Sequence, residues 1–316
     1  MNVVLTGASG FIGSHLAERL LRQGSEVTGI DCFLDYYPRI IKERNLRGFL
    51  DHPGFTFVEA DVAELDWSEI LRGKDAVFHQ AAIAGVRASW GSRFNEYAKN
   101  NILGTQLILE ASKEANLKKF VYASSSSVYG NAESLPIDEA TPARPISPYG
   151  VSKLAGEHLV SLYHKAYGVP TVSLRYFTVY GPRQRPDMAF HKFIKAVHAG
   201  ELIEVYGDGA QTRDFTYIDD AVSANLSALT GGRPGGIYNI GGGSKIKLID
   251  AIRLIENVVG RKADIRYADK QKGDAAHTYA NVTLAENDLN YSPSYDLERG
   301  LTEQYCWIRD NMDIYG

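Results

Sequence analysis

Residues 1–13, MNVVLTGASGFIG, join a short apolar run to a turn with three closely spaced glycines, and an amphipathic segment follows at Ile12–Gln23. In such a turn the absent side chains let a phosphate approach backbone N–H groups, and the N-terminus of the next helix favours negative charge. Glycines alone are weak evidence, but their place between a strand and a helix favours a dinucleotide site. The residues expected to hold the dinucleotide are Gly7, Gly10, Phe11, Ile12 and Gly13.

The alternation of apolar runs and amphipathic segments continues through the first half of the chain. Buried strands are expected at Val3–Thr6, Glu26–Ile30, Thr56–Glu59, Ala76–Gln80, Phe120–Ser124 and Val172–Tyr176. Helices are expected at Ile12–Gln23, Phe94–Ala115 and Pro148–Tyr167. This pattern predicts an α/β fold, a doubly wound parallel sheet of the Rossmann type with helices on both faces.

Beyond about Gly181 the pattern changes, and proline and glycine become frequent. Short strand-like runs remain at Glu204–Tyr206 and Ile265–Tyr267, with isolated helical segments at His191–Ala199 and Lys247–Val259. We therefore expect a smaller, mixed α/β C-terminal domain that binds the substrate.

Composition narrows the class of protein. A formal net charge of −4 over 316 residues is not that of a nucleic-acid binder, so local positive groups must hold any anionic substrate. No apolar run approaches the ~20 residues of a membrane span, and no signal peptide is recognisable. Cys32 and Cys306 are far apart, and no Cys/His cluster has metal-ligand spacing. We expect a cytoplasmic protein without metal, nucleic-acid partner or membrane contact.

Polar and small residues follow several of the expected strands. Asp31 ends the second strand about twenty residues after the glycines, where a carboxylate accepts hydrogen bonds from ribose hydroxyls and repels a 2′-phosphate. This favours NAD over NADP, although a strand-end acid can also be simply solvated. Further strand-end residues expected to contact the cofactor are Asp61, Val62, Gln80, Ala81 and Ala82.

Tyr149 and Lys153 stand four residues apart at the start of an expected helix and therefore share one face. A lysine ammonium beside a phenol favours the phenolate, so Tyr149 could remove a proton from a sugar hydroxyl. Such a pair alone usually marks an ordinary helix surface. Its significance rises because the run Ser124–Ser127 ends the fifth strand and offers Ser125 as a hydroxyl that polarises the same oxygen.

Together these residues resemble the extended short-chain dehydrogenase/reductase family, in its nucleotide-sugar epimerase branch. The matching elements are TGASGFIG, Asp31, FHQAA, Asn101, ASSSSVYG, SPYGVSK, RYFTVYGPRQRPDM, GDGAQTRDFTYIDD and KGD. The resemblance covers nearly the whole chain. It implies bound NAD, with Asn101, Ser124, Tyr149, Lys153 and Tyr176 among the cofactor contacts.

The resemblance also implies the organisation of the protein. Residues 1–178 and about 213–240 would form the NAD-binding domain, and about 179–212 and 241–316 the nucleotide-sugar-binding domain. Catalysis would rest on Tyr149, Lys153 and Ser125. Helices near 95–115 and 149–167 would pair two copies into a homodimer.

The serine run bears on the reaction. Family dehydratases carry an acidic pair, and decarboxylases a Glu, where this chain has Ser126 and Ser127. Without a carboxylate to relay a proton, elimination is disfavoured. The resemblance then implies an NAD-dependent isomerase that epimerises C4 of a UDP-sugar through a 4-keto intermediate.

The sugar is inferred from donors expected near its ring. Ser125, Ser126 and Ser127, with Thr178 and Arg185, could hold the carboxylate of UDP-glucuronate, giving UDP-galacturonate. The stretches GPRQRPDMAFHKF and DYYPRIIKERNL are also more similar to UDP-glucuronate 4-epimerases than to UDP-glucose 4-epimerases. Arg185 could instead merely pair with Asp187, and a UDP-glucose/UDP-galactose 4-epimerase remains the main alternative.

The nucleotide contacts follow from the resemblance. Arg213 matches a position that holds the diphosphate, Asp274 one that holds the uridine ribose, and Lys192 adds charge near the phosphates. An alternative of another class is a non-catalytic NAD-binding sensor. The presence of Tyr149 and Lys153 disfavours it, because such sensors commonly lose that pair.

Overall fold

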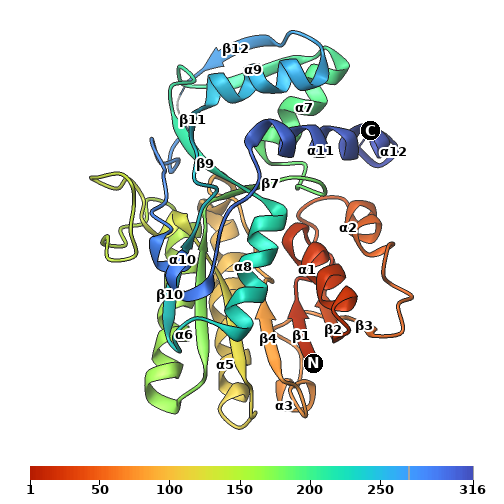
Figure 1. Ribbon diagram of the computed structural model, residues 1–316, viewed down its shortest axis with the longest axis vertical. Helices are drawn as coiled ribbons and strands as arrows, with labels where there is room; N and C mark the ends of the chain where they lie inside the picture. The colour runs from red at the N-terminus through yellow and green to blue at the C-terminus, as the bar shows by residue number, and fades with distance from the viewer. Residues whose placement is uncertain (270, 316) are drawn as a thin grey trace.

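A computed structural model describes residues 1–269 and 271–315, and its largest element is a sheet of seven strands (Figure 1). Their order is β10-β6-β5-β4-β1-β2-β3, and every neighbouring pair is parallel. The strands are β1 (Asn2–Thr6), β2 (Glu26–Asp31), β3 (Phe55–Glu59), β4 (Ala76–His79), β5 (Lys119–Ser125), β6 (Thr171–Tyr176) and β10 (Gly236–Ile240). The predicted doubly wound Rossmann sheet is therefore confirmed.

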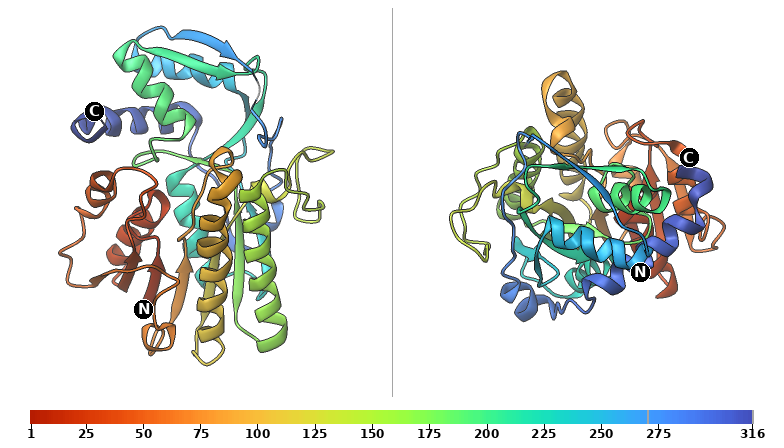
Figure 2. Two further views of the ribbon diagram at one scale, coloured as in Figure 1. Left: turned by 180° about the vertical axis from the view of Figure 1, so that it is seen from behind. Right: turned by 90° about the horizontal axis from the view of Figure 1, so that it is seen from above.

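Helices cover both faces of this sheet. One face carries α1 (Phe11–Arg22) and α8 (Ile218–Thr230), and the other carries α5 (Gly104–Ser112) and α6 (Pro148–Tyr167), as Figures 1 and 2 show from opposite sides. The central strand β5 is buried at every residue. This double burial explains why the strands are continuous apolar runs rather than alternating ones.

The expected helix Phe94–Ala115 is not a single α-helix, although its helical turns follow one another without a gap. It consists of α4 (Phe94–Tyr97), a π-helical turn at Ala98–Leu103, and α5, which ends at Ser112. The buried side chain of Asn101 lies in the wide turn and bonds to Ile83 across the fold. Such widened turns locally redirect a helix at functional sites. Two shorter helices, α2 (Arg39–Leu46) and α3 (Trp67–Ile70), were not expected from the sequence.

The smaller region has mixed sheets, as expected. Strand β9 (Thr212–Tyr217) pairs in parallel with β7 (Thr178–Tyr180) and antiparallel with β11 (Lys245–Lys247), and β8 (Leu202–Tyr206) pairs in parallel with β12 (Asp264–Ala268). Its helices are α7 (Ala189–Ala199), α9 (Leu248–Val259), α11 (Leu297–Asp310) and α12 (Met312–Tyr315), whereas α10 (Thr283–Leu289) packs against β10 and α8 of the larger part. Figures 1 and 2 place most of this region at one end of the large sheet.

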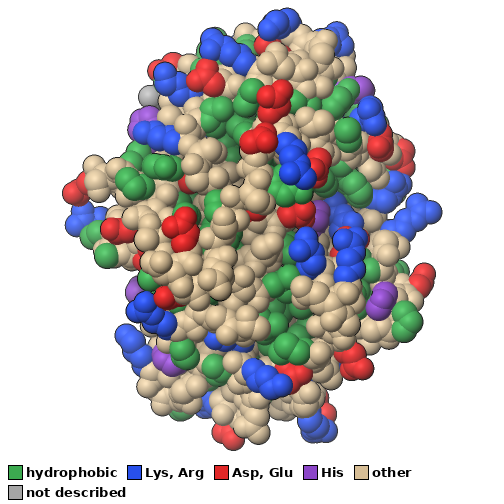
Figure 3. Space-filling model, in the orientation of Figure 1, with side chains coloured by type: hydrophobic (Ala, Val, Ile, Leu, Met, Phe, Trp, Pro, Cys, Tyr) green, Lys and Arg blue, Asp and Glu red, His purple; other side chains and the backbone are tan. Residues whose placement is uncertain are grey.

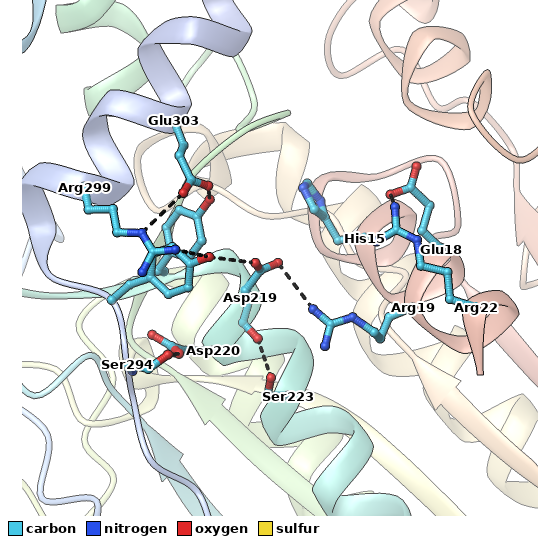
Figure 4. Close-up of polar contacts among 12 residues, drawn as sticks. His15, Glu18, Arg19, Arg22, Asp219, Asp220, Ser223, Ser294, Arg299 and Glu303 are labelled. Atoms are coloured by element: carbon cyan, nitrogen blue, oxygen red, sulfur yellow. Dashed lines mark hydrogen bonds and ion pairs between the residues drawn. The ribbon is translucent and has the colours of Figure 1, made fainter.

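A polar network joins the two parts behind the sheet edge (Figure 4). Asp219, at the start of α8, lies 3.9 Å from the guanidinium of Arg19 on α1 and accepts a hydrogen bond from Tyr295. Glu303 on α11 accepts a hydrogen bond from Tyr217 at the end of β9. These contacts tie α1, whose N-terminus faces the glycine turn, to the smaller region.

The surface has no broad area of one charge on the face drawn in Figure 3, where basic and acidic side chains are interspersed. Among the described residues, no helix is long and apolar enough to cross a membrane. No group of three or more His, Cys, Asp and Glu side chains within 1–269 and 271–315 could hold a metal ion.

Candidate active site

A cleft of about 1210 Å³ runs along the carboxyl ends of the large sheet and beneath the smaller region. Open α/β sheets bind ligands at this edge. Pockets for one drug-sized ligand measure roughly 300–1,000 Å³, so this cleft has room for a dinucleotide and a second ligand. Its walls include the glycine turn, the serine run, Tyr149 and Lys153, together with parts of α7 and β8.

The glycine turn has no space for side chains. Gly7 has φ +72°, and a Cβ built on it would lie 2.8 Å from the backbone nitrogen of Ala81. A Cβ on Gly13 would lie 2.0 Å from the carbonyl oxygen of Gly7. No side chain caps α1, so its first N–H groups are open to a ligand. The turn therefore fits a dinucleotide diphosphate, and Gly7, Gly10, Phe11, Ile12 and Gly13 all line the cleft.

Asp31 is held in place beside this turn. Its carboxylate accepts hydrogen bonds from the backbone nitrogens of Ser9 (3.2 Å) and Phe33 (2.9 Å), and the residue lines the cleft. The amine of Lys42, which the sequence interpretation missed, lines the same wall and donates to the carbonyl of Leu34. An acid and an amine thus flank the position expected for the adenosine ribose.

The next strand ends are also ordered by polar contacts. Gln80 donates hydrogen bonds to the phenol oxygen of Tyr176 (3.1 Å) and to Asn225 (2.9 Å), a buried residue of α8 that sequence reasoning missed. Val62, Gln80, Ala81, Ala82 and Tyr176 line the cleft. Asp61 instead bonds to the Lys99 ammonium (2.7 Å) just outside it.

Asn101 does not face the cleft. It is 1% exposed, and its amide bonds to both backbone groups of Ile83 (2.8 and 2.9 Å) and to the hydroxyl of Ser152 (2.9 Å). These contacts position the segment that follows Ala82. In this geometry Asn101 shapes the cofactor wall from behind.

Tyr149 and Lys153 point into the cleft from the first turns of α6. Ser147 caps this helix by accepting a hydrogen bond from the Gly150 nitrogen (3.1 Å), and Pro148 fits its first turn. Burial raises the pKa of Tyr149, while a hydrogen bond with Ser125 and the charge of Arg185 act in the opposite direction. Both effects favour the phenolate.

Lys153 is 3% exposed, and its ammonium lies 4.7 Å from the centre of the Tyr122 ring. Burial lowers the pKa of Lys153 to about 7, and the nearby Glu157 carboxylate opposes that fall. Close to neutral pH the lysine therefore carries only part of a positive charge.

The serine run lines the cleft next to Tyr149. Ser124 donates a hydrogen bond to Glu157 (2.6 Å), and the Ser125 hydroxyl accepts one from the Ser127 nitrogen (3.1 Å). Ser125, Ser126 and Ser127 thus lie in a tight turn, and all three residues line the cleft.

Thr178 and Arg185 line the same part of the cleft. The guanidinium of Arg185 forms two contacts of 2.9 Å with the Asp187 carboxylate, so the pairing left open from the sequence is present. Tyr36 also donates to Asp187, at 3.4 Å. Arg185 therefore lines the cleft but is already paired with Asp187, so a substrate carboxylate would have to compete with Asp187 for the guanidinium.

The nucleotide end of the cleft contains Asp274 and the exposed Lys192. Asp274 accepts hydrogen bonds from Arg87 (2.6 and 3.1 Å), whose guanidinium lies 4.3 Å from the centre of the Tyr206 ring. Sequence reasoning missed Arg87 and Tyr206. The only signal for Arg87 was a single arginine in the loop after β4, which is weak by itself.

Arg213 is not among the residues that line the cleft. Its guanidinium donates to the carbonyl oxygens of Thr212 (2.9 Å) and Ala276 (3.1 Å). Burial lowers the pKa of Arg213, and nearby Asp274 opposes that change. Both hydrogen bonds come from Nη1, so backbone carbonyls already occupy that nitrogen of Arg213, the residue expected to hold the diphosphate.

Comparison with known proteins gives consistent matches along the whole chain. The sequence model of the NAD dependent epimerase/dehydratase family matches residues 3–241. An uncharacterized UDP-glucose epimerase of Bacillus subtilis is 44% identical over 312 residues, which cover 98% of each chain. A UDP-glucuronate 4-epimerase of Thermodesulfobacterium geofontis is 37% identical over 318 residues, covering 98% of this chain and 97% of that one.

A solved structure agrees with these sequence matches. UDP-glucuronic acid 4-epimerase from Bacillus cereus, in complex with UDP-glucuronic acid and NAD, superimposes with a TM-score of 0.95 at 43% identity. The match covers 98% of this chain and 99% of that one. With a sheet, a glycine turn and a Tyr149–Lys153 pair of this kind, the chain belongs to the NAD dependent epimerase/dehydratase family.

Proposed function

We propose that this protein is an NAD-dependent UDP-sugar 4-epimerase that interconverts UDP-glucuronate and UDP-galacturonate. One observation carries the proposal: Tyr149, Lys153 and the serine run meet in one cleft, between a dinucleotide turn and a polar nucleotide end. The relatives named above as UDP-glucuronate 4-epimerases support the choice of substrate.

In the proposed reaction Tyr149 removes the proton from the 4-hydroxyl of the sugar. Ser125 donates to that oxygen, and Arg185 favours the phenolate through its charge. NAD, when bound, supplies a hydride acceptor that afterwards serves as a hydride donor. Tyr149 then returns its proton to the carbonyl oxygen once the sugar has presented its other face.

A 4-keto glucuronate is a β-keto acid, which loses carbon dioxide unless its carboxylate is held away from the geometry for cleavage. Ser126, Ser127 and Thr178 offer hydroxyl donors in the cleft, and Arg185 offers a charged fork. Asp187 already occupies that fork. We therefore infer that the serine and threonine hydroxyls orient the substrate carboxylate. Arg185 would then bind both that carboxylate and the carboxylate of Asp187.

A second candidate is the interconversion of UDP-glucose and UDP-galactose. The name of the Bacillus subtilis relative favours it, and serine hydroxyls can bind a hydroxymethyl group as readily as a carboxylate. A non-catalytic NAD-binding sensor is disfavoured, because Tyr149 and Lys153 line the cleft together.

Incubation with UDP-glucuronate and NAD, followed by proton NMR, tests the proposal. We expect UDP-galacturonate without pentose. UDP-xylose or a 4-keto pentose would mean that the donors do not protect the intermediate. Turnover of UDP-glucose alone would establish the second candidate, and no turnover of any UDP-sugar would favour the sensor.

We also propose that two copies associate through α5 and α6. Four apolar side chains on this side of the molecule are exposed: Leu103 (47%), Val151 (46%), Leu162 (55%) and Tyr167 (59%). An apolar face on paired helices is typical of a homodimer interface. Light scattering should give twice the chain mass, and Leu162→Glu should give the monomer.

We also propose that residues 1–178 and about 213–240 form the NAD-binding domain, that about 179–212 and 241–316 form the nucleotide-sugar-binding domain, and that the protein is cytoplasmic. Strand β10 belongs to the large sheet and helix α8 packs on it, which supports assigning about 213–240 to the NAD-binding domain. Strand β9, within the first part of that range, lies in the three-stranded sheet instead. Cys32 and Cys306 are both free thiols, which suits the reducing cytoplasm.

A further inference from the structure

A buried ion pair lies directly behind the catalytic residues. Arg175 on β6 and Glu157 on α6 are exposed by only 6% and 2%. The guanidinium makes two charge-assisted hydrogen bonds to the carboxylate, of 2.9 and 2.6 Å. A pair this deeply buried has a high desolvation cost, so its presence calls for a role beyond stability.

The pair touches each segment that carries a catalytic group. Glu157 lies one helical turn after Lys153, so the two residues share a face of α6. The same carboxylate accepts the hydrogen bond from Ser124, the residue before Ser125. Arg175 reaches further and donates to the phenol oxygen of Tyr129 (2.7 Å), which follows the turn of Ser126 and Ser127.

We propose that Glu157 and Arg175 are positioning residues of this active site: the pair anchors the strand end that presents Ser125, and the negative charge of Glu157 favours the ammonium form of Lys153. Neither residue lines the cleft, so neither is expected to touch the sugar or the cofactor. The inference about turnover rests on the proposed epimerase reaction, whereas the inference about Lys153 does not.

The sign of the effect follows from the groups that face Lys153. His79 on β4 is neutral, since burial lowers its pKa to about 3, and Tyr122 on β5 is a neutral phenol. Burial also raises the pKa of the Tyr149 phenol on the same helix, and in its protonated form this phenol adds no charge beside Lys153. Glu157 is therefore the carboxylate that raises the pKa of Lys153 against burial, and removing it lowers that pKa.

The direct test measures the protonation of Lys153 without any substrate. Competitive labelling with acetic anhydride across a pH series, read by mass spectrometry, gives the midpoint at which the amine becomes reactive. We expect Glu157→Gln to lower the midpoint by roughly one pH unit, as for loss of a close opposite charge. The Lys153 midpoint of the double variant Glu157→Gln/Arg175→Met should lie between those of Glu157→Gln and wild type, because the double variant removes both charges.

Tyr129→Phe is the matched control. It breaks the same network at its far end, where the phenol contacts Arg175 and Asn239, without changing any charge. The Lys153 midpoint should stay at the wild-type value. An unchanged midpoint in Glu157→Gln, or an equal fall in Tyr129→Phe, would overturn the proposal. If Glu157→Gln alone does not fold because Arg175 is left unpaired, the double variant must still show a downward shift of the Lys153 midpoint, smaller than the shift expected for Glu157→Gln.

Turnover adds a second readout. If the Lys153 ammonium is needed for catalysis, the alkaline limb of kcat/KM moves to lower pH in Glu157→Gln and stays in place in Tyr129→Phe. A uniform loss of rate at every pH would indicate a merely structural role. Absence of UDP-sugar turnover by wild type would refute the proposed function, while the labelling result would still decide the role of Glu157.

Discussion

The two ends of the cleft are built differently. At the catalytic end, Tyr149, Lys153 and Ser125 lie on a long capped helix and a fully buried strand. At the nucleotide end, Arg87 lies in a short turn (Arg87–Ser89) and Asp274 in irregular chain between β12 and α10. Chemistry that needs fixed geometry is thus carried by rigid elements, whereas loops hold the longer and more adaptable part of the substrate.

Removing the proposed base should produce the largest loss. Tyr149→Phe should lower kcat by about 10³-fold, because general base catalysis contributes roughly 10²–10⁴-fold. NAD content should be unchanged, since the glycine turn is untouched. Tyr163→Phe is the matched control: the same change on the same helix, where the phenol contacts Glu110 away from the cleft. Full activity in Tyr149→Phe would refute the mechanism.

The glycine turn should be the next most sensitive place. In Gly13→Ala the new Cβ would lie 2.0 Å from the Gly7 carbonyl oxygen, so the turn must open. We expect loss of copurified NAD and a fall in activity of about 10²-fold, since small misplacements in a site cost about this much. NAD released by denaturation is the measurement.

Gly24→Ala separates this effect from ordinary backbone strain. Gly24 follows the same helix with φ +76°, but nothing lies within 4 Å of its added Cβ. It should lose some stability and keep its NAD. Retention of NAD in Gly13→Ala would mean that the turn tolerates a side chain.

The same contrast explains which features the sequence could predict. Helix α6 was expected at its observed bounds, Pro148–Tyr167, because a Ser cap, a proline and an apolar stripe all act locally. The expected helix at 94–115 was wrong as a single element, because Asn101 bonds to Ile83, eighteen residues away. Periodicity cannot reveal such a contact.

Site residues follow the same rule. Local spacing in the sequence is enough to recognise the glycine turn, Asp31, Tyr149 and Lys153. All of them line the cleft. Asn225 reaches Gln80 across 145 residues, and Arg87 meets Asp274 across 187. The first pairing depends on how α8 packs on the large sheet and the second on how the smaller region lies against that sheet, so neither spacing nor residue type could indicate them.

Substitution of Arg185 tests whether this residue belongs to the catalytic end of the cleft by holding the substrate carboxylate. Arg185→Ala should lower glucuronate turnover about tenfold and let decarboxylated pentose appear, because a charged hydrogen-bond donor is lost. Asp187→Asn is the comparison variant, since it keeps Arg185 and removes the carboxylate that occupies its fork. It should give no pentose. Unchanged rate and product purity in Arg185→Ala would exclude it from carboxylate binding.

The smallest effect should come from the nucleotide end. The side chain of Arg87 is 47% exposed and already paired with Asp274, so both solvent and that partner weaken its attraction for a negatively charged nucleotide. Arg87→Ala should therefore raise KM for the UDP-sugar roughly fivefold and leave kcat near wild type. Arg72→Ala, an exposed arginine paired with Glu69 away from the cleft, should change neither constant. A fall in kcat of the size expected for Tyr149→Phe would show instead that the loop end also orders the reacting sugar, and the distinction between rigid and adaptable ends would not hold.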